Sequence, residues 1–281
     1  MHMNFFSSIF SRQSPYKQHL PFDNANFQNE IVANRATLAH ISNWIDEKAF
    51  ADSCFSYGVP EFIRKHINKP LNDDLTYTDL MVFLTKKYFS SPQYLEIGVS
   101  VGKNFFQMLN AGVPGKYVGF DIEEINPVLE KELHLRSKKE WEGLEGSIKK
   151  TRPSLKSYDF KGLDVQYMSA DVWDKQSWAK LKGNSFNIIF SDALHTPEAI
   201  LFEFEMLVQN GLLAEKFIIV WDDLVGKMKR SFFSIVRKYN KLFALREIYL
   251  LNINGWIGQY EAPHSIGIIS NFSFNNEGSA D

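Results

Sequence analysis

Short apolar runs alternate with amphipathic stretches along most of the chain beyond Ser91. Apolar runs of about four to eight residues, bounded by turn-forming residues, are typical of strands that are buried on both faces. Such runs lie at 94–98, 117–121, 165–171, 186–192 and 217–223. Because helix-like segments separate these runs, the pattern predicts an α/β fold with a doubly wound, mostly parallel sheet and helices on both faces.

The N-terminal part carries a helical pattern instead. Apolar residues recur at helical spacing through 31–68, and 76–88 predicts a further helix with Thr76 or Thr78 as its N-cap. We therefore expect a helical N-terminal cap on the sheet.

The C-terminal part predicts a closing hairpin. After a basic helix near 228–239, the stretches 244–259 and 264–271 have the composition of strands, and a short link containing Gly and Pro joins them. Two such strands form an antiparallel pair, which we expect at the edge of the sheet.

These patterns divide the chain into an arm at 1–30, the helical cap at 31–90, a main domain at 91–272 and a tail at 273–281. Within the main domain, 126–162 is long for a connection between neighbouring strands and predicts an insertion. Its sequence is charged, partly helical and rich in basic residues. Two interpretations stay open: a lid over a bound substrate, and a solvated surface helix.

Composition narrows the class of protein. Lys and Arg total 31 against 33 Asp and Glu, so the formal net charge of -2 gives no general attraction to nucleic acid. Cys54 is the single cysteine, which excludes an intramolecular disulfide and a cysteine-based zinc cluster and favours a reducing compartment. With no long apolar run and no secretory signal pattern, we expect a cytoplasmic protein without a membrane partner. A homo-oligomer stays open.

Acidic residues end most of the predicted strands. Asp121, Asp171, Asp192, Asp222 and Asp223 all stand at the carboxyl end of an apolar run. Open α/β sheets bind ligands beyond the carboxyl ends of their strands, so these carboxylates are expected along the edge where a ligand binds.

A glycine motif follows the first strand. Glu96, Gly98 and Gly102 form E-x-G-x-x-x-G at the start of a predicted helix. The dinucleotide-binding motif G-x-G-x-x-G requires a second glycine two residues after the first, and this chain has none two residues after Gly98. NAD is therefore disfavoured. Asp121 ends the next strand, where an acid can accept hydrogen bonds from ribose hydroxyls. Each feature alone also fits an ordinary strand-to-helix turn or a helix N-cap, but together they favour a nucleoside ligand.

This motif, the aspartate at 121, AD at 170–171 and SDALH at 191–195 together resemble a class I S-adenosylmethionine-dependent methyltransferase over roughly 94–270. The resemblance implies a Rossmann-like sheet and S-adenosylmethionine as cofactor. It implies that the glycine loop with Glu96, Gly98 and Gly102 passes the amino acid part of the cofactor. It further implies that Asp121 holds the ribose and that Asp171 approaches the adenine amine.

The remaining carboxylates predict a metal site. Asp192, Asp222 and Asp223 end neighbouring strands, and oxygen ligands suit Mg²⁺, Mn²⁺ or Ca²⁺ better than zinc. The three match the metal-binding acids of the metal-dependent O-methyltransferases, including catechol and macrocin-type enzymes. That resemblance implies a divalent metal, with Mg²⁺ preferred, beside the methyl group.

His195 is the candidate base. It stands three residues beyond Asp192, where the catechol enzymes have lysine. The D-x-x-H spacing of this chain is closer to that of enzymes that resemble cephalosporin hydroxylase. A helix is predicted to start at Thr196-Pro197, and its dipole would lower the pKa of His195 and keep the imidazole neutral. The alternative is a histidine that only orients the turn or binds Asp192. The other histidines, including His264, receive no functional assignment.

The resulting hypothesis is a methyltransferase that acts on a hydroxyl of a small molecule, a sugar or a phenol, with the help of a divalent metal. Two alternatives stay open. One is a metal-independent small-molecule methyltransferase, and the other is a non-catalytic, cofactor-binding interaction module.

Overall fold

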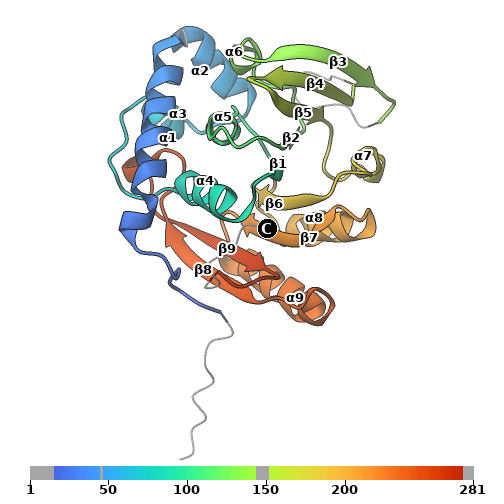
Figure 1. The fold of residues 1–281 in the computed structure, drawn as a ribbon. Coiled ribbons are helices and arrows are strands. Elements are labelled where there is room, and N and C mark those ends of the chain that lie inside the picture. Colours follow the sequence, from blue (N-terminus) through green and yellow to red (C-terminus); the bar gives the residue numbers. More distant parts are fainter. Residues whose placement is uncertain (1–15, 45–46, 144–151, 275–281) are drawn as a thin grey trace, which may run out of the picture.

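The computed structural model describes residues 16–44, 47–143 and 152–274, which form one nine-stranded sheet with helices on both faces (Figure 1). The helices are α1 (Asn24–Trp44), α2 (Glu47–Ser56), α3 (Glu61–His66), α4 (Tyr77–Tyr88), α5 (Lys103–Asn110), α6 (Pro127–Glu130), α7 (Lys175–Lys180), α8 (Pro197–Gln209) and α9 (Gly226–Phe243), with a 3₁₀ turn at Gly258–Tyr260. The strands are β1 (Gln93–Ile97), β2 (Lys116–Asp121), β3 (His134–Glu140), β4 (Ser154–Phe160), β5 (Leu163–Ser169), β6 (Phe186–Ser191), β7 (Leu213–Trp221), β8 (Glu247–Ile253) and β9 (His264–Ser270).

The sheet has the strand order β3-β4-β5-β2-β1-β6-β7-β9-β8. Its centre, from β5 to β7, is parallel and comprises the five strands that the apolar runs predict. The chain starts in the middle and builds outward on both sides of β1, so the carboxyl ends of β1, β2 and β6 meet where the strand order reverses. At the far side, β8 and β9 form the predicted antiparallel hairpin, and β9 pairs with β7.

The two faces of the sheet are covered by different helices. Adjacent residues of β6 point to opposite faces: Ile188 packs with α1, α4 and α5, and Ile189 packs with α7, α8 and α9. Helices thus cover both faces of the sheet in a three-layer arrangement (Figure 1). A hydrophobic core lies on each side of the sheet. The parallel strands are apolar throughout because both of their faces are buried.

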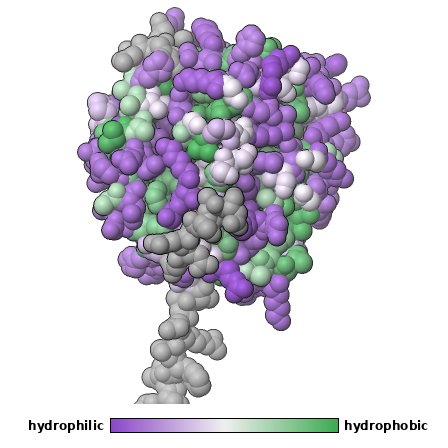
Figure 2. Space-filling model, in the orientation of Figure 1, coloured by the Kyte–Doolittle hydropathy of each residue, from purple (hydrophilic) through white to green (hydrophobic). Residues whose placement is uncertain are grey.

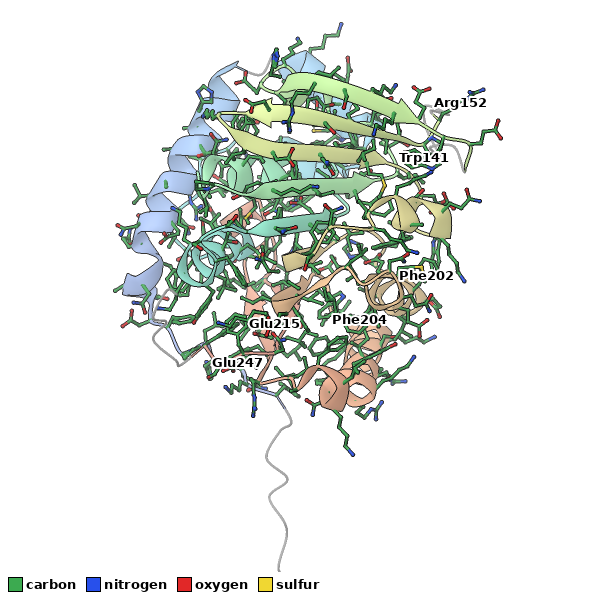
Figure 3. All side chains as sticks on the ribbon, turned by 45° about the vertical axis from the view of Figure 1, so that its right-hand side comes forward. Trp141, Arg152, Phe202, Phe204, Glu215 and Glu247 are labelled. Atoms are coloured by element: carbon green, nitrogen blue, oxygen red, sulfur yellow. The ribbon has the colours of Figure 1, made fainter. Side chains whose placement is uncertain are left out.

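Helix α8 begins as the sequence predicts. The Thr196 hydroxyl accepts a hydrogen bond from the Ala199 N–H, and proline follows at the first helical position. Figure 3 labels two of its aromatic residues, Phe202 and Phe204. The ring of Phe204 lies 4.8 Å from Tyr239 of α9, so the two helices pack together over the sheet.

The insertion is charged, but its helical part is limited to the short α6, and the rest of its described residues form a β-hairpin. After the short α6, strands β3 and β4 pair antiparallel, and β4 adds to β5 at the edge of the sheet. Residues 144–151 lie outside the described residues. The surface-helix interpretation does not fit this hairpin, and the lid over a bound substrate stays a prediction.

The N-terminal cap is helical, but it begins earlier than predicted. Helix α1 starts at Asn24, inside the segment assigned to the arm, and Lys17 pairs with β8 next to Tyr249. Thr76 is the N-cap of α4 in a capping box with Asp79, as expected. The Asp79 carboxylate also accepts hydrogen bonds from Arg35 of α1, which ties the cap to α4.

The face shown in Figure 2 mixes hydrophilic and hydrophobic residues. In the described part of the chain, no helix has both the length and the apolar character that crossing a membrane requires.

Candidate functional site

A cavity of about 540 Å³ opens at the carboxyl ends of β1, β2, β6 and β7. The α2–α3 connection, with Tyr57 and Val59, lines one part of it. The β8–β9 connection, with Trp256 and Glu261, lines another. The cavity therefore lies at the edge of the sheet where ligands of open α/β folds bind.

The glycine loop after β1 has the left-handed backbone that its glycines allow, with φ of +84° at Gly98 and +83° at Gly102. A Cβ on Gly98 would lie 2.4 Å from the Cα of Ala193, and a Cβ on Gly102 would lie 2.4 Å from Cδ1 of Leu129. In the direction that a Cβ would take, each glycine thus has protein atoms next to it and no open space for a ligand. Gly98 instead admits the chain that follows β6, which carries Asp192.

Asp121 is held by the same loop. Its Oδ2 accepts hydrogen bonds from the backbone N–H groups of Val99 and Ser100, at 2.7 and 2.8 Å, and its Oδ1 accepts one from Glu123 at 2.9 Å. Burial raises the pKa of Asp121, and the three N–H donors act against that rise. The carboxylate lines the cavity and retains lone pairs for a ligand hydroxyl.

Glu96 lies in the wall of the cavity, 1% exposed. Its carboxyl group accepts hydrogen bonds from the Tyr94 hydroxyl at 2.5 Å and the Asn104 amide at 2.8 Å. Burial nevertheless raises the pKa of Glu96 to about 8, so the group is largely neutral at pH 7.

Asp171 stands apart from the other predicted cofactor residues. Its carboxylate accepts a hydrogen bond from the Trp173 N–H at 2.9 Å in the turn before α7, and the residue is not part of the cavity lining. Gly102 is also outside the lining, whereas Glu96, Gly98 and Asp121 are part of it. The structure therefore brings together three of the five predicted cofactor residues.

The three predicted metal-binding carboxylates all line the cavity, with His195 between Asp192 and Asp223. Among the described residues, however, the group close enough to share one ion comprises Asp222, Asp223 and His264 and leaves out Asp192. The Nδ1 of His195 lies 2.8 Å from the Asp223 carboxylate, and its Nε2 lies 3.4 Å from Asp192. Asp222 follows the end of β7 and is 4% exposed. Asp223 has a φ of 50°, a strained value for a residue with a side chain, and this turn aims its carboxylate at both histidines of the site.

The sequence interpretation missed His264. Its Nδ1 lies 2.8 Å from Asp222 and 3.2 Å from Asp223, and its Nε2 lies 2.9 Å from Glu261. His264 is the first residue of β9, which runs antiparallel to β7, so its side chain comes to the edge where β7 ends. The predicted hairpin could have indicated this position. A strand that pairs antiparallel with β7 begins at the edge of the sheet where β7 ends, so its first residue lies close to Asp222 and Asp223.

The charges of the cluster depend on these pairs. The hydrogen bond to Asp223 raises the pKa of His195, and burial opposes the rise. We expected the helix start to lower this pKa, but the carboxylate is closer and outweighs the dipole. Burial acts against the charged form of His264, yet its three carboxylate partners raise the pKa to about 12. Hydrogen bonds from both histidines hold the pKa of Asp223 well below its usual range.

No protein-family model matches this chain, and no curated protein matches it. Similar solved structures include the O-methyltransferase TomG from Streptomyces achromogenes, involved in tomaymycin synthesis and solved in complex with SAM. TomG is 13% identical over 88% of this chain and 98% of its own, with a TM-score of 0.47. The SAH-bound methyltransferase PaMTH1 from Podospora anserina is 15% identical over 90% of this chain and 98% of its own, with a TM-score of 0.43.

Spermidine synthase from Thermotoga maritima is also similar, at 15% identity over 70% of this chain and 60% of its own, with a TM-score of 0.42. Because proteins named for different reactions resemble this chain at the same level, these likenesses do not select a function.

Proposed function

We propose that this chain is a methyltransferase that uses S-adenosylmethionine to methylate a hydroxyl of a small molecule, a sugar or a phenol, with the help of a divalent metal. One observation carries the proposal. A single cavity contains both the loop that holds Asp121 and the carboxylate–histidine cluster of Asp192, His195, Asp222, Asp223 and His264. A cofactor bound at the Asp121 loop would lie next to an acceptor bound at the carboxylate–histidine cluster.

The cavity suits such a cofactor in size and charge. Small-molecule sites have volumes of about 300–1,000 Å³, and this one has about 540 Å³. Carboxylates outnumber cationic side chains in the lining, which favours a ligand with a sulfonium and an ammonium group. When bound, S-adenosylmethionine supplies an activated methyl group.

His195 is the proposed general base. A hydroxyl must lose its proton during methyl transfer, and an imidazole can accept it at Nε2. The contact between Nδ1 and Asp223 selects the tautomer that carries its proton on Nδ1 and leaves Nε2 as the acceptor. Asp223 thus positions the base and stabilises its protonated form.

Asp222, Asp223 and His264 would hold the metal. One ligand atom of each lies within 4.8 Å of the others. This set includes a nitrogen donor, whereas the sequence interpretation expected oxygen ligands alone, and it suits Mn²⁺ or Fe²⁺ as well as Mg²⁺. Such an ion supplies a Lewis acid that lowers the pKa of a hydroxyl next to it.

A metal-independent methyltransferase is the second candidate, and the pairing of His264 favours it. With a pKa of about 12, His264 is an imidazolium at pH 7 and already neutralises part of the charge of Asp222 and Asp223. In that case His195 alone would take up the proton.

Isothermal titration calorimetry with S-adenosylhomocysteine, with and without Mn²⁺, tests both candidates. We expect the wild type to bind the ligand and Asp121→Ala to bind it about 1.5–3 kcal/mol more weakly, the range for a hydrogen bond to a charged group. Asp171→Ala is the matched control and should keep its affinity, because Asp171 lies outside the cavity. A wild type that does not bind S-adenosylhomocysteine would contradict the proposal.

The metal is tested by titrating Mn²⁺ into the wild type and into the Asp222→Asn/Asp223→Asn double variant. Binding to the wild type alone supports the metal-assisted mechanism. Ligand binding without any Mn²⁺ or Mg²⁺ binding selects the metal-independent mechanism.

A further inference from the structure

Lys103 is a buried cation in the wall of the same cavity. It is the first residue of α5 and is 4% exposed, and its side chain lines the cavity. The ammonium group donates a hydrogen bond to the carbonyl oxygen of Ile67 and lies 5.8 Å from the centre of the Trp256 ring. These contacts fix the ammonium group between the glycine loop, the end of α3 and the β8–β9 connection.

Lys103 has no anionic partner among residues 16–44, 47–143 and 152–274. Burial lowers its pKa to about 8, and the single ionisable group that acts against this is the Cys54 thiol. Burial raises the pKa of that thiol to about 11, so it is neutral at pH 7. Buried charges in proteins are normally paired, which makes an isolated ammonium group in a cavity wall a site for a ligand anion.

The start of α5 adds a second source of positive potential. N–H groups in the first turn of a helix have no acceptor within the helix, and the helix dipole places partial positive charge there. Lys103 and Asn104, the first two residues of α5, both line the cavity. The other charged residues of the lining are acidic, apart from His195 and His264, which are already paired with carboxylates. Lys103 is therefore the favourable place for a ligand anion.

We propose that Lys103 and the first turn of α5 bind a carboxylate of the ligand in this cavity. The inference rests on the proposed function, in which that carboxylate belongs to the amino acid part of S-adenosylmethionine. Lys103 is then a specificity residue: it distinguishes S-adenosylmethionine from sulfonium nucleosides that lack the carboxylate.

The test compares two ligands that differ by this group alone. S-adenosylmethionine and its decarboxylated form are titrated by calorimetry into the wild-type chain, Lys103→Met, Lys103→Arg and the control Lys227→Met, whose side chain is exposed. We expect the wild type and Lys227→Met to prefer S-adenosylmethionine by about 10- to 100-fold, as a hydrogen bond between charged groups implies. Lys103→Met should bind both ligands within about twofold, and Lys103→Arg should keep part of the preference.

The ratio of the two affinities separates a role in recognition from a role in folding. If Lys103 only anchors α3 through Ile67, Lys103→Met weakens both ligands equally and leaves the ratio unchanged, which overturns the inference. A wild type that binds the two ligands equally also overturns it, while leaving the proposed cofactor site standing. A wild type that binds neither ligand contradicts both the inference and the proposed function.

Discussion

Glu96 is a carboxyl group whose charge the fold disfavours. Because burial raises its pKa from 4.5 to about 8, the folded state binds a proton that the unfolded chain releases at lower pH. The protonated Glu96 therefore adds its full contribution to the free energy of unfolding below pH 4.5. This contribution is lost as the pH rises from 4.5 through 8. We expect Glu96→Gln to lack this loss and to exceed the wild type at pH 9 by a few kcal/mol.

Urea unfolding of both proteins between pH 5 and 9 measures this difference. Glutamine keeps an oxygen that can accept from Tyr94 and Asn104, so the hydrogen bonds of the site are preserved. If the two curves run parallel over the whole range, Glu96 is charged in the folded protein and our assignment of its state is wrong.

His195 makes a kinetic prediction. His195→Ala should lower turnover roughly 10²–10⁴-fold and leave the affinity for S-adenosylhomocysteine nearly unchanged, because a base acts on the reaction and not on cofactor binding. A base must be neutral to accept a proton, and Asp223 raises the pKa of His195 above 6.5. Activity should therefore rise with pH through a limb above 6.5, and Asp223→Asn should move that limb down.

We would measure the pH dependence of kcat for the wild type and for Asp223→Asn. The control is His134→Ala, because His134 lies on the exposed strand β3. If the rise of activity with pH were unchanged in Asp223→Asn, that rise would belong to a group other than His195. Full turnover in His195→Ala would leave His195 as a residue that only shapes the turn before α8.

At the scale of elements, Gly102 couples the glycine loop to α6. A Cβ there meets Cδ1 of Leu129 at 2.4 Å, and the left-handed backbone adds strain. We expect Gly102→Ala to lower the free energy of unfolding by about 1–3 kcal/mol, as overpacking does. In the Gly102→Ala/Leu129→Ala double variant, the loss should fall short of the sum of the single losses by about 0.5–3 kcal/mol.

Gly162→Ala is the control for backbone strain. Its φ is +84°, close to that of Gly102, but no heavy atom lies within 4 Å of the added Cβ. Denaturant titration of the four variants separates steric overlap from strain. Additive losses for Gly102 and Leu129 would show that the loop and α6 are not coupled.

The apolar pattern predicts elements well where both faces are buried and poorly where they are not. The central strands are continuous apolar runs and were predicted close to their observed bounds. Strand β4 alternates in burial, but two of its inward positions are Ser154 and Lys156, and β3 is exposed throughout. Such strands carry no hydrophobic period, so their charged residues suggested a helix.

At the scale of the whole molecule, the sequence predicts the cavity residues that lie at strand ends. It does not predict those that reach the cavity from distant parts of the chain. The carboxylates at 121, 192, 222 and 223 follow parallel strands, whose ends must meet at one edge. Lys103 and Glu261 reach the cavity from a helix start and a connection, where only tertiary packing determines position. The pKa of His195 was mispredicted for the same reason, because its direction depends on Asp223.

The two outer strands of the sheet have different means of avoiding aggregation. At one edge, the backbone of Lys17 pairs with β8: its N–H donates to Ile248 and its carbonyl accepts from Leu250. At the other edge β3 is fully exposed, and it carries Arg136, Lys138 and Lys139. An open strand edge is a template for another chain, and charged side chains on such an edge disfavour that pairing. Arg136 and Lys138 are held in ion pairs with Asp164 and Glu140, so this charged edge stays in place on the folded protein and is expected to oppose pairing with the β3 of a second copy.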